Sequence, residues 1–138
     1  MSDLIGRFRA ALVRPKRFDD ERGSVYEMLR LPDLAARHDG QLFVTTARSG
    51  QSKGHHYHSR KTEWFCVVAG SGEMVLEDVE TGERDQIAVS ADDPLVLKIE
   101  PGLAHALRNS GTTLLISIVY ADETYDPLDE DTYPRRLF

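Results

Sequence analysis

Short apolar or alternating segments recur along the chain, and a turn signal separates each segment from the next. The segments occupy residues 41–46, 63–69, 73–76, 86–89, 95–99 and 113–120. The turn signals are Asp39-Gly40, Gly70-Ser71-Gly72, Thr81-Gly82, Asp93-Pro94, Pro101-Gly102 and Ser110-Gly111. Because no helical pattern alternates with these segments, parallel βαβ units are not expected. The spacing predicts an all-β chain that folds as an antiparallel barrel or a double-sheet jelly roll.

The length of the chain suits one domain with a single core. It has 138 residues, of which 41% are hydrophobic, a proportion typical of a globular protein. We expect one domain over residues 1–138, with N-terminal strands within about residues 10–30, a central barrel over about 41–120 and a packed tail over about 121–138. The single helix candidate is residues 32–38, where Pro32 suits a first turn, and it is expected to be one or two turns long.

Two histidines, His56 and His58, stand two residues apart in the segment before residue 63. Side chains at positions i and i+2 of a strand share a face, so these two histidines point the same way. His55 and Tyr57 point to the opposite face. We expect packing or interface roles for that second pair rather than ligand roles.

Two more residues complete a candidate ligand set. The turn after His58 lets Glu63 begin the next strand beside the two histidines, and His105, just after the Pro101-Gly102 turn, can join them from a distant strand. Three neutral imidazoles and one carboxylate are ligands that divalent Zn, Fe, Mn, Ni or Cu accept. The set therefore predicts a metal centre, and the alternative is a pocket that keeps these residues without an ion.

The same residues resemble the two cupin motifs. The run Gly50-x5-His56-x-His58-x4-Glu63-x6-Gly70 is similar to the first motif at every position, and Gly102-x2-His105-x3-Asn109 is similar to the second. In the second motif Pro101 directly precedes Gly102, whereas the usual proline stands one residue earlier. Asn109 is expected to stabilise a turn through its amide. The resemblance implies a single-domain cupin jelly-roll β-barrel with a divalent ion, Zn, Fe, Mn or Ni, held by His56, His58, Glu63 and His105.

The flanks of this core resemble enzymes that act on nucleotide sugars. Residues 20–27, Asp-Glu-Arg-Gly-Ser-Val-Tyr-Glu, are similar to the Asp-x-Arg-Gly-x-Phe-x-Glu segment of dTDP-4-keto-6-deoxyglucose-type 3,5-epimerases. Lys53-Gly54-His55-His56 is similar to their Arg-Gly-x-His landmark. Residues 120–127 and 131–133 look like the cupin half of the bifunctional reductase/epimerases that make capsular sugar precursors. These resemblances imply a homodimer that binds a nucleotide-linked sugar through Arg22, Glu27 and Lys53, with the Arg22 segment reaching a neighbour's pocket.

The resemblance further implies an epimerase or isomerase acting on a 4-keto-6-deoxy sugar in surface polysaccharide or glycoside biosynthesis. Such chemistry needs a base, a group that stabilises the enolate oxygen and an acid on the opposite face. His56 stands where the epimerases have their base, and Tyr125 lines up best with their late tyrosine, which returns the proton. A histidine whose lone pair binds a metal cannot accept a proton with it, so we favour His56 as a ligand. The base is then open between a hydroxide on the ion and Tyr120.

Simpler roles stay open for several of these residues. Arg22 can form only a surface ion pair with a neighbouring acid, and Lys53 can be only a solvated loop cation. Glu27 can be a plain exposed residue, and Tyr120 and Tyr125 can be packing residues. Two other functions also stay open: an Fe(II) cupin dioxygenase with the same ligands, and a non-catalytic cupin that binds a sugar or another small molecule.

Charge and hydropathy narrow the expected partners. The formal net charge of -6 argues against general affinity for nucleic acid or for an anionic membrane. No apolar run approaches the length of a membrane span and the N-terminus lacks a signal-peptide pattern, so a soluble, cytoplasmic protein is expected. Cys66 lies in an apolar run and is expected to be a buried, inert thiol.

Overall fold

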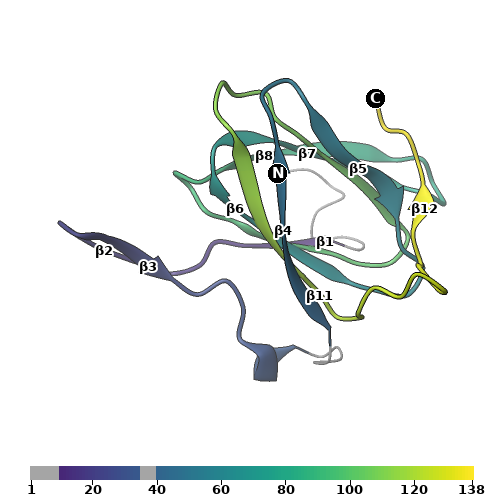
Figure 1. The fold of residues 1–138 in the computed structure, drawn as a ribbon, viewed down its shortest axis with the longest axis horizontal. Coiled ribbons are helices and arrows are strands. Elements are labelled where there is room, and N and C mark those ends of the chain that lie inside the picture. Colours follow the sequence, from purple (N-terminus) through teal and green to yellow (C-terminus); the bar gives the residue numbers. More distant parts are fainter. Residues whose placement is uncertain (1–9, 35–39) are drawn as a thin grey trace.

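The structure is a computed structural model that describes residues 10–34 and 40–138. Two five-stranded antiparallel sheets pack against each other, and a two-stranded hairpin extends away from them (Figure 1). The β6 sheet has the order β1 (Ala10–Val13), β9 (Val96–Ile99), β6 (Glu63–Ala69), β11 (Leu115–Ala121) and β4 (Gln41–Ala47). The β10 sheet has the order β12 (Tyr133–Pro134), β5 (Ser52–Tyr57), β10 (Leu103–Arg108), β7 (Ser71–Asp78) and β8 (Arg84–Ser90). The hairpin consists of β2 (Arg17–Asp20) and β3 (Gly23–Tyr26).

The main hydrophobic core lies between the two sheets. Each sheet contributes the apolar side chains of its inner face, as expected for strands whose successive side chains alternate between faces. The buried members of this core are Phe65, Val67, Met74, Leu76, Val89, Leu97, Ile99, Leu103, Leu107, Leu115 and Val119. The predicted all-β jelly-roll fold is confirmed.

A second apolar cluster covers the outer face of the β6 sheet. It contains the buried residues Trp64, Cys66, Val96 and Tyr120, against which Tyr26, Met28, Leu29 and Leu34 of the N-terminal segment pack. Strand β6 is therefore covered on both faces over residues 64–67, which explains why it reads as a continuous apolar run rather than an alternating one. Cys66 is buried as predicted, and burial raises the pKa of its thiol.

The predicted segments match strands β4, β6, β7, β8, β9 and β11, with ends that move by a few residues. Of the predicted helix at residues 32–38, residues 32 and 33 belong to the 3-10 turn η1 (Leu31–Asp33), and residues 35–38 lie outside the described part of the chain. No helix among the described residues has the length and hydropathy of a membrane span.

An extra residue in β5 decides which of its side chains face the space between the sheets. Along the pairing of β10 with β5, His105 lies opposite His56 and the next residue, Ala106, lies opposite Gly54, so His55 is a bulge. His55 has a φ of 58° and Gly54 a φ of 106°, where an added Cβ would lie 2.8 Å from the carbonyl oxygen of His105. Glycine is thus required at position 54. The bulge shifts the alternation by one, so Lys53 and His56 face the same side.

Candidate metal centre

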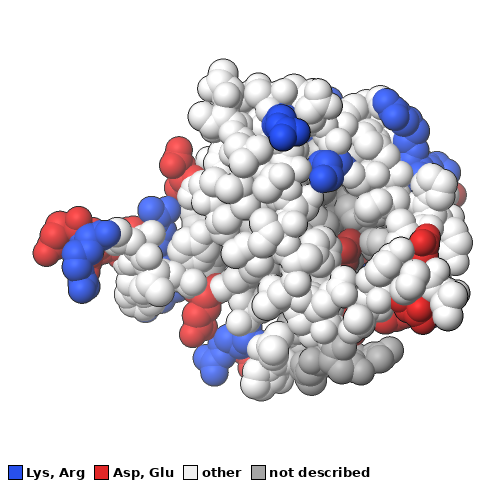
Figure 2. All heavy atoms as spheres, in the orientation of Figure 1, with Lys and Arg blue, Asp and Glu red and all other residues white. Residues whose placement is uncertain are grey.

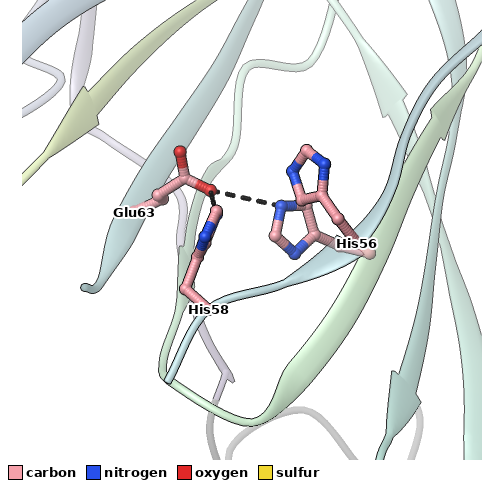
Figure 3. A group of neighbouring side chains, drawn as sticks. His56, His58 and Glu63 are labelled. Atoms are coloured by element: carbon pink, nitrogen blue, oxygen red, sulfur yellow. Dashed lines mark hydrogen bonds and ion pairs between the residues drawn. The ribbon is translucent and has the colours of Figure 1, made fainter. Parts of the chain in front are cut away.

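Four potential ligands meet at one end of the space between the sheets. His56 comes from β5, His58 directly follows that strand, Glu63 is the first residue of β6, and His105 comes from β10. One ligand atom from each lies within 4.8 Å of those of the others. Figure 3 shows His56, His58 and Glu63 approaching one another from their strands. The structure thus brings together the residues of the predicted set, with His56 half-buried and the other three buried.

Backbone carbonyls fix the orientation of two of the imidazoles. The Nδ1 atom of His58 lies 2.8 Å from the carbonyl oxygen of Asp131, and the Nδ1 atom of His105 lies 3.2 Å from that of Leu103. A carbonyl oxygen only accepts, so each Nδ1 carries the hydrogen and each Nε2 of the neutral ring presents a lone pair. Carbonyl partners of this kind are typical of metal-bound histidines.

Both Nε2 atoms point at the same carboxylate oxygen. Glu63 Oε1 lies 2.9 Å from His58 Nε2 and 3.2 Å from His105 Nε2. His105 Nε2 is buried and has no hydrogen-bond partner in the described part of the structure. Lone pairs facing a carboxylate are stable only with positive charge between them, which protons or a cation can supply. Imidazole and carboxylate donors suit a divalent transition metal, so the residues fit such an ion.

The protonation states of His56 and Glu63 suit the same arrangement. Burial, reinforced by the nearby His105 and His58, lowers the pKa of His56 to about 4, so its ring is neutral near pH 7. Burial alone would raise the pKa of Glu63, but the close contacts of its carboxylate with His105 and His58 outweigh that effect and hold the pKa below its usual value. Glu63 is therefore a carboxylate, and the neutral ring of His56 belongs to the same cluster.

Asp131 ties the C-terminal tail to the metal centre. Its carboxylate accepts hydrogen bonds from the backbone N–H groups of Ser59, Arg60 and Lys61, at 2.9, 2.8 and 3.1 Å. Burial would raise the pKa of Asp131, but the hydrogen bonds from Ser59, Arg60 and Lys61 outweigh it and lower the pKa to about 2. Its carbonyl holds His58, as described above. Sequence reasoning missed this role, for which the only signal was the resemblance at residues 131–133.

A cavity of about 270 Å³ extends from the four ligands. Part of its wall is apolar and is formed by Phe43, Phe65, Met74 and Leu107. Polar residues line the remainder, and these are Gln41, Thr45, Lys53, Lys61, Tyr125 and Thr132. A cavity that joins an apolar wall to a few polar groups is typical of a small-molecule site.

Two other predicted site residues, Lys53 and Tyr125, line this cavity. The bulge at His55 turns Lys53 inward, and the lysine side chain is exposed to solvent. Tyr125 is 49% exposed, and its hydroxyl donates to Glu130 Oε1 at 2.9 Å. That hydrogen bond raises the pKa of Tyr125, which keeps the phenol protonated.

Three predicted site residues lie elsewhere. Tyr120 lies in the second apolar cluster with its ring centroid 5.8 Å from that of Trp64, because the next residue, Ala121, faces the cavity. The prediction of Tyr120 as a base is therefore corrected. Arg22 pairs with Asp20 in the projecting hairpin, and Glu27 is exposed just after it. Neither Arg22 nor Glu27 lines the cavity of its own chain.

Comparison with known proteins identifies the family. Residues 18–133 match the family described as the polysaccharide biosynthesis C-terminal domain. The chain belongs to this family. Over 114 residues it is 32% identical to a UDP-2-acetamido-2,6-beta-L-arabino-hexul-4-ose reductase of Pseudomonas aeruginosa, covering 83% of this chain and 29% of the reductase. It is also 32% identical, over 117 residues, to the spore coat polysaccharide biosynthesis protein SpsL of Bacillus subtilis, covering 81% of this chain and 78% of SpsL.

Several solved structures superpose on the chain. The capsular polysaccharide assembling protein CapF of Staphylococcus aureus superposes with a TM-score of 0.70 at 32% identity, over 89% of this chain and 34% of CapF. Another CapF structure, with the same TM-score, identity and coverage, contains the inhibitor 3-isopropenyl-tropolone. A dTDP sugar isomerase of Desulfovibrio desulfuricans shares the fold, with a TM-score of 0.81 at 22% identity over 92% of this chain and 83% of the isomerase. The chain thus spans about a third of the length of CapF and of the reductase. The predicted resemblance to these cupins is confirmed.

Proposed function

We propose that this chain is a metal-dependent cupin that epimerises or isomerises a nucleotide-linked 4-keto-6-deoxy sugar. The observation that carries the proposal is the convergence of three imidazoles and one carboxylate at the end of a cavity, with two Nε2 lone pairs aimed at the Glu63 oxygen. The proposed ligands are His56, His58, Glu63 and His105. When bound, a divalent ion would supply Lewis-acid stabilisation of a negative oxygen without redox change.

The relatives support the proposed substrate class. The name of the P. aeruginosa reductase denotes a UDP-linked sugar with a ketone at carbon 4, and SpsL is named for polysaccharide biosynthesis. A ketone acidifies the hydrogen on the neighbouring carbon. When that C–H bond breaks, its electron pair forms a C=C bond, the carbonyl π pair moves to oxygen, and the proton passes to a base. Return of a proton to the opposite face gives the epimer.

The residues of the cavity suit this chemistry. Phe43, Phe65 and Leu107 form a wall that limits water around the reacting carbon. Tyr125 reaches the cavity with a protonated hydroxyl, so it is our candidate for the acid that returns the proton. Because we assign His56 to the ion and place Tyr120 outside the cavity, the group that removes the proton is left unassigned.

We further propose that the active form is a homodimer. The hairpin side chains Phe18 and Val25 are 57% and 65% exposed, and Leu42 and Val44 on the outer face of edge strand β4 are 69% and 64% exposed. Figure 2 shows few charged side chains over β4 and β11, whereas the end of the hairpin is densely charged. Apolar surface and an open strand edge of this kind favour association. A partner's cavity is where Arg22 could contact the nucleotide, since it lies away from the cavity of its own chain.

Two measurements test the proposed function. The first is metal analysis of protein purified without chelator and then supplied with Zn, Mn, Fe or Ni, in which we expect one ion per chain. The second is incubation with UDP- and dTDP-linked 4-keto-6-deoxy sugars in deuterated water, in which a ring hydrogen next to the ketone should exchange only with the metal-loaded protein. Oxygen uptake without such exchange would replace the epimerase with a dioxygenase. Binding of the sugar with neither reaction would leave a binding module.

A further inference from the structure

Lys61 carries a charged side chain into the cavity. It lies in the turn between β5 and β6, two residues before Glu63, and only 6% of its surface is exposed. Its backbone N–H donates to Asp131, which anchors the residue, while its side chain lines the cavity. Lysine is almost never buried to this degree unless it is paired. We therefore expect an acidic group that pairs with Lys61.

Among the residues that the structure describes, no acid pairs with the Lys61 ammonium. Glu63 is engaged by His58 and His105. The Asp131 carboxylate accepts hydrogen bonds from the backbone N–H groups of the turn. Glu123 and Asp129 form ion pairs with Arg60. A cationic side chain that is almost buried, has no ion-pair partner and lines a cavity favours a ligand of opposite charge in that cavity.

The charge of the surrounding groups indicates the sign of that ligand. With a divalent ion bound, the ion and the Glu63 carboxylate together would carry one net positive charge, to which Lys61 would add a second. Lys61 and His56 line the same cavity. A half-apolar cavity with this positive excess suits an anionic oxygen, because charges interact strongly where water is limited.

We propose that Lys61 is a catalytic residue whose ammonium donates a hydrogen bond to the substrate oxygen that becomes the enolate. This inference rests on the proposed function. The ammonium keeps its proton throughout: the carbonyl π pair moves to oxygen as the neighbouring C–H bond breaks, and Lys61 N–H groups stabilise the charge that appears there. Pre-positioned donors of this kind act mainly on the transition state rather than on the neutral ketone.

The test compares Lys61→Met, Lys61→Arg and the control Lys98→Met. Methionine keeps the unbranched shape without charge, and Lys98 lies outside the cavity, paired with Glu100. We expect Lys61→Met to keep its metal, to unfold at an equal or higher temperature because an unpaired charge is removed, and to lower kcat of deuterium exchange about 100-fold with little change in KM. Lys61→Arg should recover part of kcat. Lys98→Met should match wild type in every measurement.

A binding measurement separates this inference from the proposed function. The probe is 3-isopropenyl-tropolone, whose deprotonated form carries a negative oxygen next to a carbonyl and so resembles an enolate. We expect the metal-loaded Lys61→Met to bind it at least about tenfold more weakly than wild type and than Lys98→Met. Weaker probe binding supports a Lys61 anion site even if wild type exchanges no 4-keto sugar. Wild-type kcat and wild-type probe affinity in Lys61→Met overturn the inference, and so does a wild type that neither exchanges nor binds the probe.

Discussion

The metal-centre end of the cavity and the β2–β3 hairpin differ in how completely one chain builds them. At the metal centre His58, Glu63 and His105 are each less than a tenth exposed and touch one another. In the hairpin, Val25 is mostly exposed, and within the described part of the chain the Arg22 side chain bonds only Asp20, two residues away. The two regions also differ in position: the metal centre lies between the sheets, whereas the hairpin extends away from both of them (Figure 1).

This contrast implies that the proposed chemistry depends on residues of one chain, whereas the proposed nucleotide binding depends on two chains. The groups for the chemistry are assembled by strands β5, β6 and β10 of one chain. Neither Arg22 nor Glu27 lines the cavity beside those groups in the same chain. A variant at the metal centre should therefore inactivate the cavity of its own chain. A hairpin variant should leave that cavity active when the partner subunit has an intact hairpin.

The largest effect is expected from removing a buried ligand. His58→Ala or His105→Ala should weaken metal binding by at least about 100-fold and abolish exchange, because the remaining donors cannot enclose the ion. Metal content after dialysis and circular dichroism would measure binding and folding. The matched control is His55→Asn, since His55 faces away from the cavity in a backbone conformation that Asn adopts readily. Full metal content in His58→Ala would show that His58 is not a required metal ligand.

A smaller loss is expected from Tyr125→Phe, which removes only a hydroxyl at the cavity. If that hydroxyl returns the proton, kcat should fall about 100-fold while KM and metal content hold. Tyr133→Phe serves as the control, because Tyr133 lies in the same tail but stacks on Tyr57 outside the cavity. Equal turnover in the two variants would remove Tyr125 from the chemistry and leave the metal centre untouched.

Arg22→Ala should act on binding rather than on the bound-state reaction. We expect KM to rise by about tenfold with kcat nearly constant, because a phosphate contact remote from the reacting carbon contributes uniform binding. Arg30→Ala is the control, an exposed arginine that pairs with its neighbour Asp33. Steady-state exchange rates at several substrate concentrations provide both constants.

Mixing two variants sharpens the comparison between the regions. At substrate concentrations where each is poorly active, combining Arg22→Ala with His58→Ala should restore about one quarter of wild-type activity, since half of the dimers are mixed and each has one complete site. No recovery after subunit exchange, or a monomer by light scattering, would contradict a hairpin that acts in a partner's cavity.

The sequence predicted the parts of the site that depend on local spacing. His56 and His58 share a face because they are two apart, and Glu63 begins the next strand. Asn109 holds a turn as predicted, since its amide donates to the carbonyls of Ala47 and Thr113 and accepts from Gly111. Spacing within a strand and turn chemistry are local, so they can be read without a structure.

The parts that depend on distant packing could not be read in this way. Tyr120 lies in a strand that is buried on both faces, so no alternation of polar and apolar residues marks its direction. The single-residue bulge at His55 turns Lys53 inward. Lys61 looks like a solvated turn residue until the fold encloses it, and Asp131 meets its partners 70 or more residues away.

The smallest effect concerns Asp131, which joins the tail to the metal centre. Its pKa is lowered to about 2 from an ordinary 3.8, so the folded state favours the carboxylate. The stabilisation is therefore fully present above about pH 4 and is lost as pH falls through about 2. Its expected size is about 2 kcal/mol in the free energy of unfolding. Asp131→Asn is a suitable variant because Asn tolerates the φ of 51° at this position.

Urea unfolding of metal-free protein at pH 6 and near pH 2.5 tests this charge. At pH 6 Asp131→Asn should be less stable than wild type by about 2 kcal/mol, because an amide accepts fewer of the turn's N–H groups than a carboxylate does. Near pH 2.5 the difference should shrink, since protonation begins to remove the same charge from wild type. Metal affinity at pH 7 should change much less, because His58 is held by the Asp131 carbonyl, which the variant keeps. A difference that is equal at both pH values would mean that side-chain shape, and not the carboxylate charge, holds the turn beside the metal centre.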